Sequence, residues 1–452
     1  MATRARARAW LSAAVAVLAL SGLAVANLPA QPPVEPPGQV GQAQPMGAIP
    51  PPTESERTAA AERSSAVTDL LRKRAESMVN RDEAAFVATL DPLAEPVFLD
   101  EQRALFANLA DIPLETWSYL LRPDDTLDLT TLPAPAADPT AELWAPAVEL
   151  KYALRGIDQT PTTRPMGYLF ARRGDTWYLR SDSALTDLGR RSWRGPWDFG
   201  PCVVTPTANG VVVAHRGSQP MVDRLVRELD SSVAAVSQVW GDQWPQKVAL
   251  ILPDSPAEMR ALVGPDFPVE SVVAVAIADR VDTAKQTATG QRVVLSPTGA
   301  RALSVTSLRV VLRHEITHVA ARAATVDGSP MWLLEGFADY VGYRDSGITL
   351  AQGAPDLAKR VRESGPPTAL PEDRDFRARD RALDMAYQQA WSIARFLGDR
   401  YGEAKLVELY RELAGAGPIS ASDTDDLLRR VIGLDRAGLL KQWQSYLRAT
   451  LR

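Results

Sequence analysis

Residues 314–318 read His314-Glu315-Ile316-Thr317-His318, and the rest of the chain is interpreted outward from this stretch. Two histidines four positions apart lie on one face of an α-helix, one turn from each other. That geometry lets both imidazoles reach one zinc ion, with Glu315 between them positioned as a general base. The chain has only three histidines, and this motif uses two of them.

A second informative stretch begins a short distance downstream and supplies acidic residues. It reads Trp332-Leu333-Leu334-Glu335-Gly336-Phe337-Ala338-Asp339-Tyr340. We expect it to form its own helix, with Ser329 as N-cap and Pro330 at the first helical position. Asp339 then lies one turn beyond Glu335 on the same face. A carboxylate there can accept the free ring N–H of a ligand histidine and hold its tautomer.

Together, HExxH and the following E-G-x-A-D resemble the gluzincin branch of the HExxH metallopeptidases, the thermolysin-like clan. The chain is most similar to the peptidase MA-like domains of that clan, over roughly residues 203–452. Two other patterns are missing from the sequence. No third histidine follows at metzincin spacing, and no G-x-M-E-N stretch precedes the motif, as it does in gluzincin aminopeptidases.

The resemblance implies a role for each motif residue and a bound Zn²⁺ cofactor. It makes His314, His318 and Glu335 the metal ligands, Glu315 the general base and Asp339 the partner that orients a ligand histidine.

Tyr387 is a further candidate for the site. No histidine follows His318, so a histidine that stabilises the transition state is not available from the C-terminal part. The resemblance places a tyrosine at the position of Tyr387, where its phenol could donate to an oxyanion. The alternative is a core tyrosine in an amphipathic helix, and periodicity does not separate the two. We expect His215, far upstream on a strand, to be structural.

Composition limits the classes of function. The net charge is −5 over 452 residues, with no basic stripe, which argues against a nucleic-acid partner. The single cysteine, Cys202, excludes an internal disulfide. We expect it to be a small buried residue near the start of a strand.

The first residues resemble a targeting segment. Arg4, Arg6 and Arg8 precede an uncharged apolar run over 10–26, which ends in an A-x-A cleavage pattern. This predicts a cleaved signal peptide over 1–26, or alternatively an uncleaved membrane tether through residues 10–26. The protein is then secreted, or anchored with its bulk outside the cytoplasm.

The remaining chain is predicted to be α+β. Residues 27–58 are Pro-rich and indicate a linker. Residues 59–188 predict a small N-terminal domain of helices and an antiparallel sheet, and 189–202 an interdomain seam containing tryptophans. Residues 203–452 predict a zinc metallopeptidase domain with a mixed sheet, an HExxH helix near 304–323 and a helical C-terminal part.

The sequence therefore predicts an exported zinc-dependent peptidase, an endopeptidase that acts on peptides or proteins. The strand at 292–295 could be an edge strand to which an extended substrate adds. Two alternatives remain open. One is a catalytically silent zinc-containing module for binding or assembly in the envelope, against which the intact Glu315 argues. The other keeps zinc hydrolysis but changes the substrate, for example to a cell-wall peptide crosslink.

Overall fold

The computed structural model describes residues 53–451, except 134–137, 266, 268, 270–271 and 379–380. The predicted signal peptide and most of the predicted linker lie outside this part. None of the described helices is both long enough and apolar enough to cross a membrane. The linker was predicted to extend to residue 58, but helix α2 already begins at Glu54. Thr53 and Glu56 form a capping box that starts the helix at this point.

The N-terminal part contains helices followed by two antiparallel sheets, as predicted. The sheets have the strand orders β1-β3-β4 and β2-β5-β6. The elements are α2 (Glu54–Asn80), α3 (Glu83–Val87), α4 (Pro96–Asn108), β1 (Leu114–Thr126), β2 (Glu142–Trp144), β3 (Pro146–Leu154), β4 (Thr162–Met166), β5 (Leu169–Arg173) and β6 (Thr176–Ser181).

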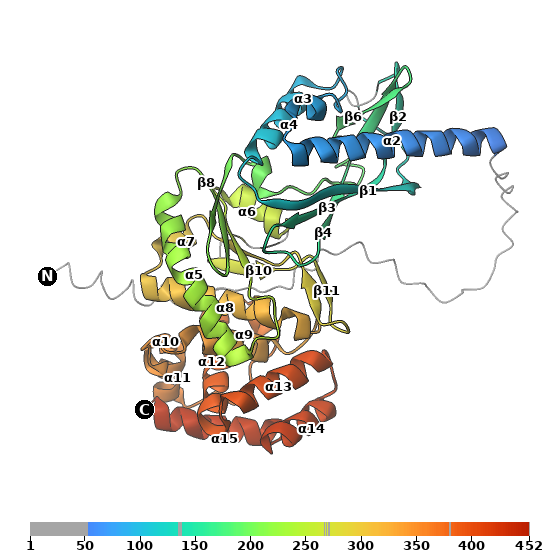
Figure 1. Ribbon diagram of the computed structural model, residues 1–452. Helices are drawn as coiled ribbons and strands as arrows, with labels where there is room; N and C mark the ends of the chain where they lie inside the picture. Colours follow the sequence, from blue (N-terminus) through green and yellow to red (C-terminus); the bar gives the residue numbers. More distant parts are fainter. Residues whose placement is uncertain are drawn as a thin grey trace, which may run out of the picture.

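Helix α2 packs on this part with only its C-terminal half. Val67, Leu71 and Met78 recur at helical spacing and are buried. Residues 53–62 are all exposed. The first turns of α2 consequently project beyond the sheets, at the blue end of the chain in Figure 1.

The C-terminal part is built on one five-stranded mixed sheet with the order β10-β13-β9-β8-β7. Its strands are β7 (Cys202–Pro206), β8 (Gly210–His215), β9 (Val248–Leu252), β10 (Ala274–Ile277) and β13 (Arg292–Leu295). The inner pairs β8–β9 and β9–β13 are parallel, and the outer pairs are antiparallel. The prediction that strand 292–295 is an edge strand was wrong, because β13 is paired on both sides. Within the described residues the edge strands are β10 and β7.

Helices make up most of the remaining C-terminal part, and the predicted HExxH helix and helical C-terminus are confirmed. A two-stranded hairpin, β11 (Arg280–Asp282) and β12 (Thr287–Thr289), also belongs to this part. The helices are η1 (Pro196–Asp198), α5 (Gln219–Trp240), α6 (Pro256–Val263), α7 (Gly299–Ala302), α8 (Val305–Ala321), η2 (Arg322–Ala324), α9 (Met331–Tyr343), α10 (Leu350–Gly353), α11 (Pro355–Ser364), η3 (Asp375–Arg377), α12 (Arg381–Tyr401), α13 (Glu403–Ala416), α14 (Ala421–Ile432) and α15 (Arg436–Thr450).

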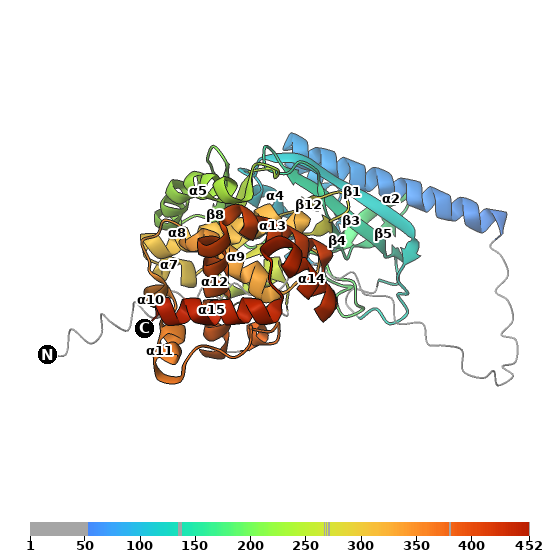
Figure 2. The same cartoon turned by 90° about the horizontal axis from the view of Figure 1, so that it is seen from below.

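The mixed sheet is buried on both faces. On β8, Val212 points into the core formed with α5 and α8, while Val211 and Val213 join the core of the N-terminal part. Because side chains alternate along a strand, the sheet separates the two cores while belonging to both. Figure 1 shows this order of layers from top to bottom: N-terminal part, sheet, α5 and α8, then the C-terminal helices, which face the viewer in Figure 2.

Several single residues behave as the sequence predicted. Cys202 is 3% exposed at the start of β7. His215 is buried, and its Nε2 lies 2.8 Å from the Glu258 carboxylate, which makes it a structural residue. Trp193 stacks on Tyr152 at 5.3 Å between ring centroids, so this tryptophan of the predicted seam serves packing.

Candidate metal centre

Helix α8 places the two motif histidines side by side. Ser304 caps its N-terminus, and the helix runs without interruption through both histidines. One helical turn separates His314 from His318, so their Nε2 atoms lie 3.1 Å apart. His314 is fully buried, and the His318 side chain is 12% exposed. The pair therefore faces inward, with His318 nearer to solvent.

Helix α9 brings a carboxylate to the same point. It begins at Met331 with Pro330 at the N-cap, one residue later than predicted. Ser329 is not the cap, because its hydroxyl donates to the carbonyls of Val326 and Ala414. The first backbone N–H of the helix, that of Met331, instead donates at 2.9 Å to the side chain of Asp373, which lies far away in the sequence.

The spacing of the three candidate ligands fits a zinc ion. The Glu335 Oε2 atom lies 3.3 Å from His314 Nε2 and 3.6 Å from His318 Nε2. Ligands about 2.0–2.2 Å from a tetrahedral zinc lie about 3.3–3.6 Å from each other. The donor set of two imidazoles and one carboxylate also suits zinc, and such a site leaves a fourth position open. His314, His318 and Glu335 would therefore hold the ion.

Asp339 lies next to His314, one of these candidate ligands. The His314 Nδ1–H donates to Asp339 at 2.8 Å, which leaves Nε2 facing Glu335. Burial opposes a charge on His314, but the hydrogen bond and charge of Asp339 outweigh it and raise the pKa of His314 well above its usual value. Burial raises the pKa of Glu335, but the charges and hydrogen bonds of both histidines lower it to about 2. The cluster thus resembles a site prepared for a cation, which would displace the histidine proton.

Glu315 is buried next to the cluster without taking part in it. Its carboxylate has no side-chain hydrogen-bond partner within the described part of the chain, and the residue is 0% exposed. Burial raises its pKa, while the charges of His314 and His318 and a backbone hydrogen bond from Ala276 lower it. A fully buried carboxylate without a side-chain partner is costly for the folded state.

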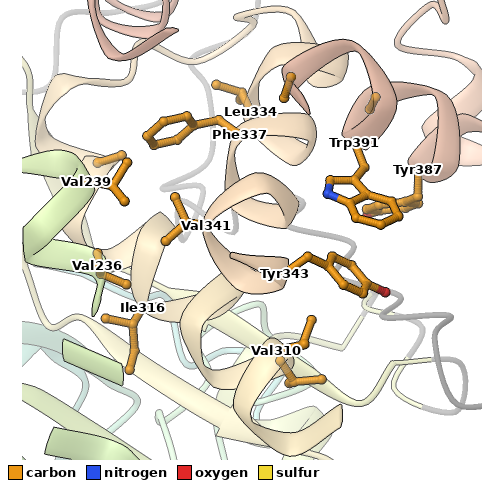
Figure 3. Close-up of a cluster of buried hydrophobic side chains, with 14 of the residues drawn as sticks. Val236, Val239, Val310, Ile316, Leu334, Phe337, Val341, Tyr343, Tyr387 and Trp391 are labelled. Atoms are coloured by element: carbon orange, nitrogen blue, oxygen red, sulfur yellow. The ribbon is translucent and has the colours of Figure 1, made fainter. Parts of the chain in front are cut away.

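Tyr387 packs in the core and also has its hydroxyl near the candidate ligands. It is 7% exposed and packs against Phe376 with ring centroids 5.4 Å apart, as a core residue does. Burial raises its pKa well above the usual value, and the charges of Glu335, Asp339 and Glu315 and a hydrogen bond to Glu335 act in the same direction. Figure 3 shows it on the same helix as Trp391 within the apolar cluster. Its hydroxyl is therefore close to the metal ligands.

Two glycines allow the three site helices to approach closely. A Cβ on Gly336 would lie 2.4 Å from the Ala390 carbonyl oxygen of α12. One on Gly342 would lie 2.9 Å from the Val310 carbonyl oxygen of α8. Helix α9 is thus pressed between α8 and α12, which positions Glu335 and Asp339. No role for Gly336 was predicted, although a helical glycine next to a candidate ligand is a detectable signal.

The comparison with protein families agrees with the two motifs. Residues 298–449, about a third of the chain, match the family model described as the Peptidase MA superfamily. This confirms the resemblance over a segment that contains every residue of the metal centre. A search of curated proteins found no match.

Among solved structures, the chain is similar to M1 zinc metallopeptidases from Deinococcus radiodurans. A point mutant aligns with a TM-score of 0.33 at 15% identity, over 68% of this chain and 62% of that one. The mutant bound to a Tyr-Ser-Ala substrate gives 0.32 at 14% identity, over 69% and 62%. The chain without a stated mutation gives 0.30 at 13%, over 69% and 62%. This chain therefore spans less than two thirds of the length of these structures.

Proposed function

We propose that this protein is a zinc-dependent peptidase. One observation carries the proposal: His314, His318 and Glu335 form a triangle with zinc-sized edges, and beside it lies Glu315, a buried carboxylate with no side-chain hydrogen-bond partner. The match to the Peptidase MA superfamily supports the same conclusion. A module that only bound zinc would gain nothing from Glu315, whereas hydrolysis requires a base there.

The chain's own residues can be assigned complementary tasks in hydrolysis. A zinc ion held by the three ligands would act as a Lewis acid and lower the pKa of water toward neutrality. Glu315 would accept a proton from the attacking water and pass it to the leaving amine. Asp339 keeps His314 in the tautomer whose Nε2 is available. Tyr387 has a hydroxyl near the ligands that would donate to the developing oxyanion.

An extended peptide is the substrate that suits the edge strand. β10 has one unpaired side within the described sheet, and α8 packs against it, with Ala276 close enough to Glu315 to affect its pKa. A peptide added there would gain backbone hydrogen bonds with little sequence specificity. The residues of β10 are Ala274, Val275, Ala276 and Ile277, so no acidic side chain on the strand would bind a free α-amino group. We therefore favour an endopeptidase.

The test separates an enzyme from a silent zinc module. Glu315→Gln keeps the shape of the side chain and leaves the ligands intact, so we expect about one zinc per chain and almost no turnover. His318→Ala should lose both the metal and the activity. A broad peptide library digested by the purified protein would provide the substrates.

Two results would contradict the proposal or part of it. If wild-type protein carries zinc and cuts nothing in the library, the envelope binding or assembly module is the better description. If Glu315→Gln retains wild-type turnover, the general base has been wrongly assigned.

We also propose that the protein is exported, on the basis of the arginines and the apolar run within residues 1–26. Residues 1–58 fused to a reporter should carry it across a bacterial membrane. A mature N-terminus at Asn27 would indicate cleavage, and a full-length product in the membrane fraction would indicate an anchor. A reporter that stays in the cytoplasm would contradict export.

A further inference from the structure

Two buried ion pairs connect the N-terminal part to the strands beside the metal centre. Arg292 of β13 donates to both oxygens of Asp158 at 2.7 Å, and these side chains are 3% and 5% exposed. Arg164 of β4 pairs with Asp279, which follows the edge strand β10, and these side chains are 10% and 5% exposed. The Thr162 hydroxyl also donates to Asp279.

The attachment points lie at one end of the proposed substrate strand. Arg292 is directly opposite Ile277, the last residue of β10, in the antiparallel register. Asp279 follows two residues later and is also held through its backbone, because its N–H donates to the Thr289 carbonyl at 2.9 Å. The strand end and the β11–β12 hairpin are thus fixed from the N-terminal side.

The other side of the same segment is attached to the HExxH helix. The Gln291 amide donates to the Val319 carbonyl at 2.7 Å, one residue after the ligand His318. The chain from 279 to 292 is therefore held between the N-terminal part and α8. This segment directly follows β10 and leads into β13, which pairs with β10.

The interface around the ion pairs is tightly packed. The cavity between the two parts, lined in part by Arg164, Trp193 and Arg292, measures about 20 Å³, and a space of that size holds about one water. The Arg164 guanidinium also lies 4.8 Å from the Trp193 ring centre. Buried ion pairs add little stability compared with apolar residues of the same size, but their directional bonds specify one arrangement. Here the two ion pairs specify how the N-terminal part sits against β13 and the residues that follow β10.

We propose that Asp279, held by Arg164 and Thr162, is a positioning residue through which the N-terminal part sets the edge strand that receives the peptide. The inference rests on the proposed peptidase function for its kinetic consequence. Asp279 touches neither the ligands nor the substrate, and acts through β10. Loosening it should weaken peptide binding while leaving the metal and the chemical step in place.

The experiment compares Asp279→Asn with a matched control in full-length, zinc-loaded protein. Asp91→Asn is the control, because Asp91 is likewise a buried aspartate paired with arginine. Its partners, Arg173 and Arg180, both lie within the N-terminal part. We expect Asp279→Asn to raise KM about 5- to 20-fold with kcat within about 2-fold and zinc content unchanged. Asp91→Asn should leave KM unchanged.

Two further measurements keep the proposal testable. Thr162→Val removes only a neutral hydroxyl from Asp279, so it should fold and should raise KM in the same direction by a smaller factor. Hydrogen exchange of the amides in 272–292 requires no activity: it should be faster in Asp279→Asn and unchanged in Asp91→Asn. If the wild type cuts no peptide, the peptidase proposal fails, and exchange still decides the positioning role. Unchanged exchange, or a KM that rises equally in Asp91→Asn, would overturn it.

Discussion

Among single residues, Glu315 and His314 are buried to the same degree but differ in their contacts. His314 bonds to Asp339 on one side and faces Glu335 on the other, whereas Glu315 has no side-chain hydrogen-bond partner. The difference matters because an imidazole with a bonded Nδ1–H has only one orientation available for a metal. A carboxylate without a side-chain partner can still accept a proton. One helix thereby holds a fixed ligand next to a free base.

Substitution of Tyr387 by Phe tests the oxyanion donor. The change removes one hydroxyl near Glu335 and keeps the ring that packs against Phe376. If the hydroxyl acts in the transition state, kcat should fall by about 10²- to 10³-fold with zinc content unchanged. Steady-state kinetics and metal analysis measure both quantities. A variant with wild-type kcat and a lowered melting temperature would make Tyr387 a core residue only.

Asp198 predicts a specific pH dependence of stability. Burial raises its pKa to about 6, against the opposing charge of Arg194. The folded state therefore binds this proton more tightly than the unfolded chain does, and the contribution of Asp198 to stability falls as the pH rises from about 4 to about 6. In Asp198→Asn that fall is absent. The free energy of unfolding of the variant relative to wild type should therefore increase by about 2–3 kcal/mol between pH 4 and pH 7.

Urea unfolding of metal-free protein at both pH values provides the measurement, since zinc loss then does not contribute. Asp230→Asn is the control of opposite sign. Burial works to raise the pKa of Asp230, but hydrogen bonds from Thr207, Asn209 and Ala208 lower it overall. Its contribution is present above the usual aspartate pKa and is lost as the pH falls. A difference between Asp198→Asn and wild type that stays constant with pH would contradict the assignment.

Among the elements, helix α9 is closely packed on two sides. It carries a metal ligand and the carboxylate that orients another, and it contacts α8 on one side and α12 on the other. Both contacts occur at glycines, Gly336 and Gly342, where backbone meets backbone. The ligand geometry therefore depends on helix spacing as much as on the ligands themselves.

Gly336→Ala should separate α9 from α12, because the added methyl group would lie 2.4 Å from the Ala390 carbonyl oxygen. We expect a loss of about 1–3 kcal/mol in unfolding free energy and zinc binding weaker by about 10-fold. Gly415→Ala is the matched control, since a methyl group added to this exposed helical glycine would meet only the Ala324 carbonyl oxygen, at 3.8 Å. It should gain about 0.5–1 kcal/mol. Calorimetry and zinc titration measure both variants, and equal behaviour would argue against the close-packing account.

The elements also show what the sequence could predict. The apolar periodicity of α5, α8 and α12 is local, so their existence and the facing of His314 and His318 could be predicted from it. Strand order is not local: β13 looked like an edge strand until its pairing with both β9 and β10 was visible. Likewise nothing in the sequence joins Arg164 to Asp279, because their contact depends on how two sheets meet.

In the whole molecule, the N-terminal part shares one of the two cores with the mixed sheet of the C-terminal part. Trp197, Val213 and Ala249 belong to the same buried cluster as the N-terminal strands, although Val213 and Ala249 lie on the mixed sheet. A strand residue such as Ala249, 0% exposed in the whole chain, would face water if the N-terminal part were removed. The two parts therefore depend on each other to bury this core, although the sequence pattern changes clearly near residue 200.

A fragment of residues 203–452 should consequently fail to fold on its own. It would expose one face of the mixed sheet and leave Arg292 without Asp158. We expect aggregation or a transition without cooperativity, whereas residues 53–452 should melt in a single step. Calorimetry and near-UV circular dichroism distinguish these cases. A soluble 203–452 fragment that binds zinc and melts cooperatively would contradict the shared core.

The projecting end of α2 has a consequence for whatever precedes it. Its exposed turns over residues 54–62 are capped by Thr53 and continue a helix that is packed further along, so they need no nucleation of their own. At 1.5 Å per residue they extend about 14 Å from the body. A flexible segment of equal length would reach a similar distance in every direction. The helix instead acts as a short rigid arm, so a label attached at Thr53 would be held on one side of the molecule.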